Sequence, residues 1–162
     1  MSFTVFDNFL LPEDLKILKM QLPSKGDLSI KWNDHKNFSI YQNVINKFMI
    51  AAINKGYNFS TYAGYEQWFR NSSIVGPHID KDEILLEEEN KYSLPICSII
   101  YYTNIENLNG GKLIIQNEDF ITPKNNKLII LGPNILHAIE DFTGTRKSFL
   151  VNFWKKKPKG YE

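Results

Sequence analysis

The sequence predicts an α+β fold that is mainly β: a double-stranded β-helix, or jelly roll, braced by two N-terminal helices. Residues 12–22 and 39–56 each repeat apolar side chains at the three-to-four spacing of a helix. From Tyr57 onward, about eight short runs of β-branched and aromatic residues alternate with Gly, Pro and Asn turns. We expect a single domain over 1–162, with 1–60 as a helical N-terminal preface and 61–155 as the jelly-roll core.

The N-terminal preface begins with a predicted strand at 3–9 and a first helix at 12–22, where Pro12 occupies the first turn. Pro23 to Gly26 should end that helix. Ser39 and Gln42 have the spacing of a capping box and predict the start of the second helix. Between the helices, 31–37 is polar and expected to be irregular, with His35 exposed and away from any metal site.

The predicted strands of the core lie at 64–70, 94–104, 112–116, 120–123, 127–131, 137–142 and 146–154, and a Gly-Pro turn leads into His78. The charged segment 82–91 is expected to be a solvated loop or short helix, placed where a lid could cover the site. The basic tail 155–159 is expected to be solvated.

Composition and charge limit the function classes. The formal net charge is +1, so no basic field recruits nucleic acid, and a nucleic-acid partner is not expected. The lone Cys97 predicts a small buried hydrophobe in a reducing, cytoplasmic setting. We find no signal-peptide pattern and no apolar run of membrane-spanning length, so a membrane partner is not expected either. The oligomeric state is not indicated.

Two of the three histidines belong to a pattern that predicts a metal site. His78 and Asp80 are two positions apart, which places both side chains on one face of an extended strand. His137 would complete two imidazoles and a carboxylate, a set that binds one face of an octahedral Fe(II) ion and leaves positions open. Arg146 follows and suits a small-molecule carboxylate. A His-x-Asp triplet arises often by chance, and a lone histidine is usually structural; the ordered set favours a metal.

The motifs at 78–80, 99–104, 110–113, His137 and 146–148 together resemble the 2-oxoglutarate- and Fe(II)-dependent dioxygenases. The prolyl hydroxylase type is the most similar, and small oxygenases encoded by phages are similar too. The resemblance covers roughly 64–154. It implies that His78, Asp80 and His137 ligate iron, that Arg146 binds the distal carboxylate of the co-substrate 2-oxoglutarate, and that ascorbate serves as a reductant.

The resemblance also implies that Tyr102 and Ser148 assist Arg146, although a packed strand tyrosine is nearly as good an interpretation of Tyr102. Asn152 could reach toward the substrate. The family often has a tyrosine about ten residues before the first ligand, where this sequence has Trp68 and Phe69. The nucleic-acid demethylase branch carries a second arginine where this sequence has Asn152, which counts against nucleobase repair.

Three functions remain open. The favoured one is hydroxylation of a peptidyl residue, preferably proline, with release of succinate and CO2 in the cytoplasm (the host cytoplasm if the chain is phage-encoded). For this, Tyr62, Tyr65, Trp68 and Arg70 could form one wall of a peptide groove. The second is the same chemistry on a free amino acid or metabolite, with Asp82 and Glu83 as nearby acids. The third is a non-catalytic jelly-roll binding module, which Arg146 argues against because a structural metal needs no carboxylate-binding fork.

Overall fold

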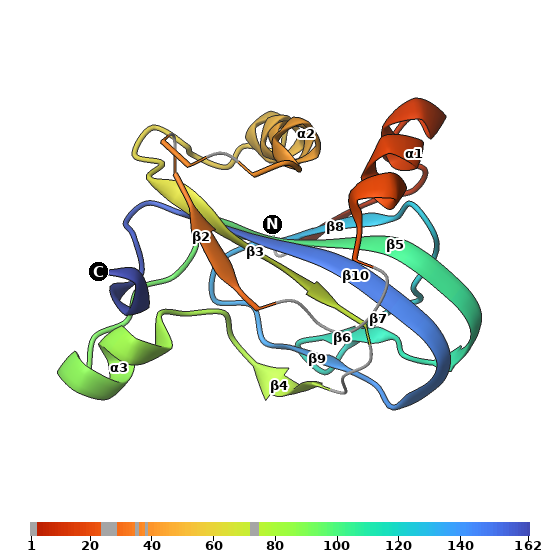
Figure 1. The fold of residues 1–162 in the computed structure, drawn as a ribbon. Coiled ribbons are helices and arrows are strands. Elements are labelled where there is room, and N and C mark those ends of the chain that lie inside the picture. Colours follow the sequence, from red (N-terminus) through yellow and green to blue (C-terminus); the bar gives the residue numbers. More distant parts are fainter. Residues whose placement is uncertain (1–2, 24–28, 35, 38, 72–74) are drawn as a thin grey trace.

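The computed structural model describes residues 3–23, 29–34, 36–37, 39–71 and 75–162, so the expectation for His35 and the end of the first helix beyond Pro23 lie outside the described residues. Two antiparallel sheets and a layer of helices make up the fold (Figure 1). The mainly β, α+β class is confirmed, and the two sheets are consistent with the predicted jelly roll.

The larger sheet has six strands in the order β1 (Phe3–Phe6), β8 (Leu128–Leu131), β5 (Cys97–Gly110), β10 (Phe142–Trp154), β3 (Gly64–Arg70) and β2 (Lys31–Asn33). The smaller sheet has four, in the order β4 (Val75–His78), β9 (His137–Ile139), β6 (Leu113–Ile115) and β7 (Asp119–Ile121). Since β4 is an edge strand, it tolerates Pro77, which has no N–H to donate to a neighbour.

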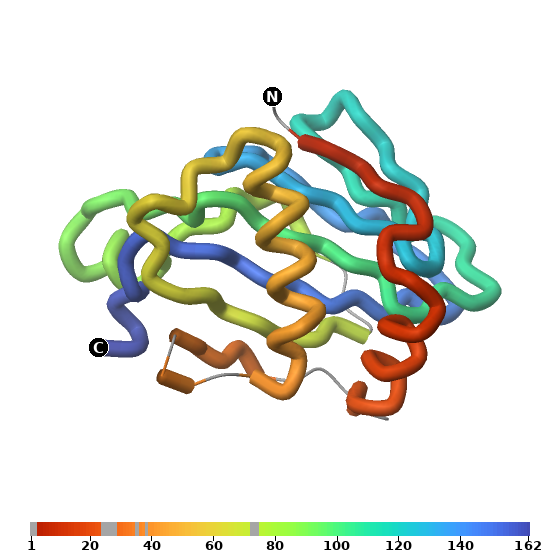
Figure 2. Tube along the Cα trace, turned by 90° about the horizontal axis from the view of Figure 1, so that it is seen from above, coloured from red at the N-terminus to blue at the C-terminus, as the bar shows by residue number. Residues whose placement is uncertain are grey.

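Helix α1 (Pro12–Gln21) and helix α2 (Gln42–Asn54) lie on the outer face of the larger sheet, and α2 crosses its strands (Figure 2). The apolar stripe of α2 buries Val44, Ile45, Phe48 and Ala52. The predicted capping box is wrong, because the Ser39 hydroxyl accepts a hydrogen bond from the Tyr41 amide at 3.0 Å and the helix begins only at Gln42. No helix in the described part of the chain is both long and apolar enough to cross a membrane.

Two cores lie on opposite faces of the larger sheet. The outer core is aromatic, and in it Phe149 of β10 stacks on Phe69 of β3 with ring centroids 4.5 Å apart. The inner core, between the sheets, is built largely from aliphatic residues such as Ile100, Leu113 and Ile129. Because strand side chains alternate, β10 directs Phe149, Val151 and Phe153 outward and keeps Arg146, Ser148 and Asn152 for the inner face.

Several predicted boundaries differ from the structure. The 31–37 segment contains strand β2, and the predicted turn at 143–145 lies inside the long strand β10. Gly144 permits this course: its φ is +93°, and a Cβ there would lie 2.2 Å from the Asn107 carbonyl oxygen. The opening strand ends at Phe6 instead of Phe9.

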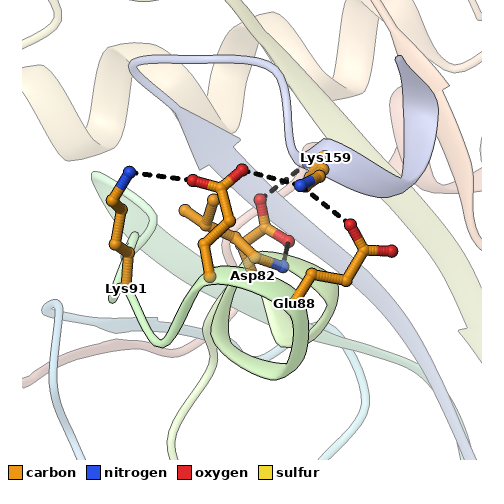
Figure 3. A network of polar contacts seen from close by, with 6 residues as sticks. Asp82, Glu88, Lys91 and Lys159 are labelled. Atoms are coloured by element: carbon orange, nitrogen blue, oxygen red, sulfur yellow. Dashed lines mark hydrogen bonds and ion pairs between the residues drawn. The ribbon is translucent and has the colours of Figure 1, made fainter.

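The segment 82–91 folds as the short helix α3 (Glu83–Glu89), one of the two forms expected for it. Asp82 caps α3, accepting from the Leu85 amide at 3.0 Å, and its other oxygen accepts from the Lys159 amide at 2.7 Å (Figure 3). Lys159, which begins the turn η1 (Lys159–Tyr161), forms ion pairs with Glu88 at 2.8 Å and Glu89 at 2.6 Å. The prediction that the whole tail is solvated is therefore wrong at Lys159, whose partners precede it by about seventy positions.

Candidate active site

The three predicted metal ligands lie together at one end of the smaller sheet. Strands β4 and β9 are neighbours, and their register sets His78 directly opposite His137, with ring centroids 4.3 Å apart. Asp80 follows two residues after His78, and its carboxylate oxygens lie 3.5 Å from His78 Nε2 and 3.8 Å from His137 Nε2. Each of the three residues offers one potential ligand atom, and these three atoms lie within 4.8 Å of one another. The arrangement can hold a metal ion.

Both imidazoles are oriented by the backbone. Nδ1 of His78 lies 2.9 Å from the Gly76 carbonyl oxygen, and Nδ1 of His137 lies 2.9 Å from the Ile135 carbonyl oxygen. A carbonyl only accepts, so each Nδ1 carries a proton, and Nε2 is the ring nitrogen left to ligate a metal. Such outer contacts set the tautomer and the ring angle of metal-binding histidines.

The surroundings of Asp80 favour its charged form, and they shift the pKa values of the two histidines in opposite directions. Burial acts to raise the pKa of Asp80, but the hydrogen bond with His78 and the neighbouring histidines outweigh it, so that pKa is lowered. The hydrogen bond with Asp80 raises the pKa of His78, whereas burial lowers the pKa of His137. An ionised carboxylate and neutral imidazoles are the forms that ligate metals.

Arg146 lines the same cavity as the three predicted ligands, and it is 2% exposed. Its Nε donates to the Gly111 carbonyl oxygen at 2.9 Å, and one Nη donates to the Tyr102 hydroxyl at 3.1 Å. Gly111 permits this approach, since a Cβ there would lie 3.2 Å from Arg146 Cδ. No acidic residue in the described ranges pairs with Arg146, so several guanidinium donors remain for an anion.

A strand irregularity brings Tyr102 to Arg146. The pairing of β10 with β5 shifts between Lys147 and Ser148, so that Lys147 faces Asn104 and Ser148 faces Tyr102, leaving Thr103 as the extra residue. The bulge lets Tyr102 and Ile105, three positions apart, both join the inner core. Tyr102 is fully buried there, and its ring lies 5.0 Å from the guanidinium carbon of Arg146.

The structure brings most of the remaining predicted residues to the cavity. Ser148 and Asn152 line it, and the Ser148 hydroxyl lies 3.5 Å from the Arg70 carbonyl oxygen. Trp68 also lines it, and its Nε1 is buried without a hydrogen-bond partner in the described part of the chain. Cys97 is buried, as expected, and burial raises its pKa to about 12, which leaves an unreactive thiol.

The predicted groove wall is half wrong. Tyr65 is part of the outer core, and Tyr62 packs against it, on the face of the larger sheet away from the ligands. The reason is strand alternation: Tyr65 and Phe69 of β3 point outward, so Trp68 and Arg70 are left for the inner face. Asp82 and Glu83 do line a neighbouring cleft, although Asp82 serves as the cap of α3.

Sequence reasoning missed Glu66 and Tyr161. Glu66 lies on the inner face of β3, where Tyr161 donates to it at 2.9 Å and Trp154 Nε1 at 2.8 Å. The alternation of β3 could have placed Glu66 on the face of Trp68 and Arg70. No local signal connects it with Tyr161, which is 95 positions away.

Comparison with models of protein families finds no match for this sequence, and comparison with curated proteins finds none either. Solved structures do match. A prolyl-4-hydroxylase from Pseudomonas putida has a TM-score of 0.65 at 17% identity, covering 96% of this chain and 94% of that one. A viral collagen prolyl hydroxylase from Paramecium bursaria Chlorella virus-1, in complex with 2OG, has a TM-score of 0.63 at 15% identity, covering 95% and 94%.

A prolyl hydroxylase from Trichoplax adhaerens, in complex with a peptide fragment of the hypoxia inducible factor oxygen degradation domain, has a TM-score of 0.56 at 15% identity. The match covers 99% of this chain and 87% of that one. At these identities the likeness establishes the fold. The resemblance that the motifs predicted is therefore confirmed at this level: the chain has the fold of prolyl hydroxylases and related 2OG-Fe(II) oxygenases.

Proposed function

We propose that this protein is a non-haem Fe(II) dioxygenase that uses 2-oxoglutarate to hydroxylate a peptidyl residue, with proline favoured. The observation that carries the proposal is the position of Arg146. A buried guanidinium is costly when, as among the residues that the structure describes, no acidic side chain pairs with it, and Arg146 shares a cavity with the His-Asp-His set. A ligand that brings its own carboxylate next to the metal would resolve that cost.

The residues of the cavity fit both Fe(II) and 2-oxoglutarate. Two imidazoles and a carboxylate are the ligand set of non-haem Fe(II) oxygenases. The planar fork of Arg146 suits the distal carboxylate of 2-oxoglutarate, with Tyr102 as its neighbour. The buried, unpartnered Nε1 of Trp68 supplies a donor for the keto-acid end, in place of the hydroxyl that the family's tyrosine would offer. Ser148 lies on the same inner face.

When bound, iron and 2-oxoglutarate together supply the oxidation: one atom of O2 enters succinate as CO2 leaves, and the other enters a C–H bond of the substrate. The protein itself would hold the metal and orient the co-substrate. His78, Asp80 and His137 fix the metal, Arg146 aligns the acid, and the inner-core side chains around Leu113 keep water away from the reacting atoms.

The substrate would enter from a cleft of about 430 Å³ that borders the metal ligands. Its size is within the range of sites for small ligands or a few peptide residues. The match to a prolyl hydroxylase that binds a peptide favours a peptidyl substrate. The charged groups of the cleft, among them Arg70, favour the second candidate, a free amino acid or a charged metabolite.

Anaerobic titration with Fe(II) and then 2-oxoglutarate tests the chemistry. We expect a weak visible charge-transfer band that needs both components and that fails in the Arg146→Met variant. Oxygen, ascorbate and proline-containing peptides should then raise succinate formation above the uncoupled background and give a product heavier by one oxygen atom. No band with the wild type would refute the oxygenase. Stimulation by free amino acids alone would reverse the order of the two substrate classes.

A further inference from the structure

The cleft beside the predicted metal ligands has a wall in which the proposed binding of metal and co-substrate uses only Trp68. It is formed by the inner face of β3, by α3 and by the C-terminal turn η1. Glu66, Trp68 and Arg70 come from β3, Ile84 from α3 and Tyr161 from η1, and His78 and Asp80 connect this wall to the metal site. A substrate beside the metal would therefore contact the wall.

Glu66 is the distinctive group of this wall. Its Oε1 accepts from the Tyr161 hydroxyl at 2.9 Å, and its Oε2 accepts from Trp154 Nε1 at 2.8 Å. Asn152 is a third hydrogen-bonding neighbour. All three partners are uncharged. Within the described residues no lysine, arginine or histidine forms an ion pair with Glu66, so its carboxylate is oriented but has no cationic partner, and burial raises its pKa.

The other carboxylates of the cleft have evident roles. Asp80 belongs to the metal ligands. Asp82 caps α3 through the Leu85 amide and accepts from the Lys159 amide. Glu83 pairs with Lys81 at 2.8 Å and is largely exposed. Glu66 alone among these four combines partial burial, fixed orientation and no cationic or helix-capping partner. A carboxylate taken out of water in this way is stabilised by a cation that binds to it.

The sheet places Glu66 at a defined separation from Ser98, which is a neighbour of the predicted metal ligand Asp80. The register of β3, β10 and β5 aligns Glu66 with Asn152, and Asn152 with Ser98. Ser98 in turn forms a hydrogen bond with the metal ligand Asp80. Two strand spacings separate the backbones of Glu66 and Ser98, which amounts to roughly 10 Å. A group bound at Glu66 is therefore near enough to the predicted metal site to belong to the same substrate molecule as the reacting carbon.

We propose that Glu66 binds a positively charged nitrogen of the substrate and thereby selects substrates that carry one. The inference rests on the proposed oxygenase only in taking this cleft as the substrate site. Two sources share the chemistry: the side chain of a basic residue beside the hydroxylated one in a peptide, and the ammonium group of a free amino acid. Tyr161 and Trp154 hold the carboxylate in place, so the specificity depends on the last turn of the chain.

Equilibrium binding to the Mn(II)- and 2-oxoglutarate-loaded protein, measured anaerobically by calorimetry, provides the test. The peptide probes are acetylated and amidated pentapeptides with a central proline, in which lysine or its uncharged analogue norleucine occupies each flanking position in turn. The amino-acid probes are L-proline and N-acetyl-L-proline. We expect the cationic member of at least one pair to bind about tenfold tighter, as a charge-assisted hydrogen bond allows. The pair that shows this preference identifies the source.

Glu66→Gln should abolish the preference. The amide can still accept from Trp154 and donate to the Tyr161 oxygen, so the wall keeps its shape. Glu83→Gln is the matched control: it makes the same change in the same cleft, at an exposed carboxylate already paired with Lys81, and should keep the full preference.

Equal binding of both members of every pair by the wild-type protein, or no binding of any probe, would overturn the inference without recourse to a variant. Loss of the preference in Glu83→Gln as well as in Glu66→Gln would also overturn it, because the preference would then come from the overall negative charge of the cleft and not from Glu66. These failures are separate from failure of the proposed function. A charge-transfer band with Fe(II) and 2-oxoglutarate upholds the oxygenase whatever the probes show.

Discussion

At the scale of single residues, His78, Asp80 and His137 are each already held by contacts other than a metal. Replacing any one of them with alanine should therefore abolish Mn(II) binding while the protein stays folded, because two ligands do not retain a labile divalent ion. Calorimetric titration with Mn(II), an air-stable substitute for Fe(II), measures the loss, and circular dichroism checks the fold. An alanine variant that binds Mn(II) as tightly as the wild type is not missing a ligand.

Arg146→Lys keeps the positive charge but loses the planar fork and the Nε donor to Gly111. We expect the dissociation constant for 2-oxoglutarate to rise by roughly tenfold or more, with Mn(II) affinity unchanged. Lys147→Arg, one position along β10 and on the opposite face of the sheet, is the control. Unchanged 2-oxoglutarate binding by Arg146→Lys would mean that the two-pronged geometry of Arg146 has no part in co-substrate binding.

The sequence singled out His78, Asp80, His137 and Arg146 because each belongs to a short motif or a strand position whose face can be counted, and the structure brings them to one cavity. It did not reveal Glu66, whose partners come from the far end of the chain. Trp68 was noted only as a departure from the family. Its unpartnered Nε1 depends on what surrounds the indole, and packing of that kind is not encoded in local spacing.

At the scale of elements, α3 and the C-terminal turn stabilise each other through Lys159, which contacts Glu88, Glu89 and, by its amide, Asp82 (Figure 3). Lys159→Ala should speed amide hydrogen exchange in α3, because the helix has no buried residue of its own to hold it. The matched control is Lys157→Ala, an exposed tail lysine two positions earlier. Mass spectrometry of the exchanged peptides checks the difference between the two variants.

The same experiment bears on the idea that α3 is a lid. If α3 opens to admit substrate, its amides should exchange quickly in the free protein and slow down when a peptide binds. Protection in α3 equal to that of β5, with or without Lys159, would contradict a lid.

Element type was predictable where a strong period extended over a long segment, as in the apolar stripe of α2. The ends of helices and strands, and the existence of short strands, were not predictable from the sequence. β2 has only three residues, and its pairing with β3 decides its conformation more than its polar sequence does. The capping-box prediction at Ser39 was wrong because the serine closes the preceding turn instead.

At the scale of the whole molecule, the larger sheet separates an outer core from an inner core, and the inner core borders the cavity of the predicted ligands. Phe149 belongs to the outer core, away from the predicted metal ligands. Phe149→Ala should lower the free energy of unfolding by about 3–5 kcal/mol, since it leaves a cavity among stacked rings. Mn(II) affinity at low temperature, where the variant is still folded, should match the wild type.

Leu113→Ala removes a comparably buried side chain from the inner core, and Leu113 lines the cavity that holds the predicted metal ligands. This variant should lose stability and 2-oxoglutarate affinity together. Chemical denaturation and calorimetry measure the two properties. Equal loss of ligand affinity in both variants would show that the two cores are not independent.

The mainly β class was accessible from the sequence because helix-like and strand-like periods occupy separate parts of the chain. The strand order was not, because neighbours such as β1 and β8 are more than a hundred positions apart. The jelly roll was predicted from the two helical segments followed by about eight short strands, and the two antiparallel sheets are consistent with it.

Strand β10 presents consecutive residues to the two sides of the larger sheet. As a consequence, its sequence can diverge along two separate tracks. Exchanges at 146, 148 and 152 would change the groups that line the cavity, whereas exchanges at 149, 151 and 153 would change the packing of the outer core. A change of ligand would therefore involve alternate positions of β10. Inserting one residue into β10 would turn the cavity-facing side chains toward the outer core and the outer-core side chains toward the cavity.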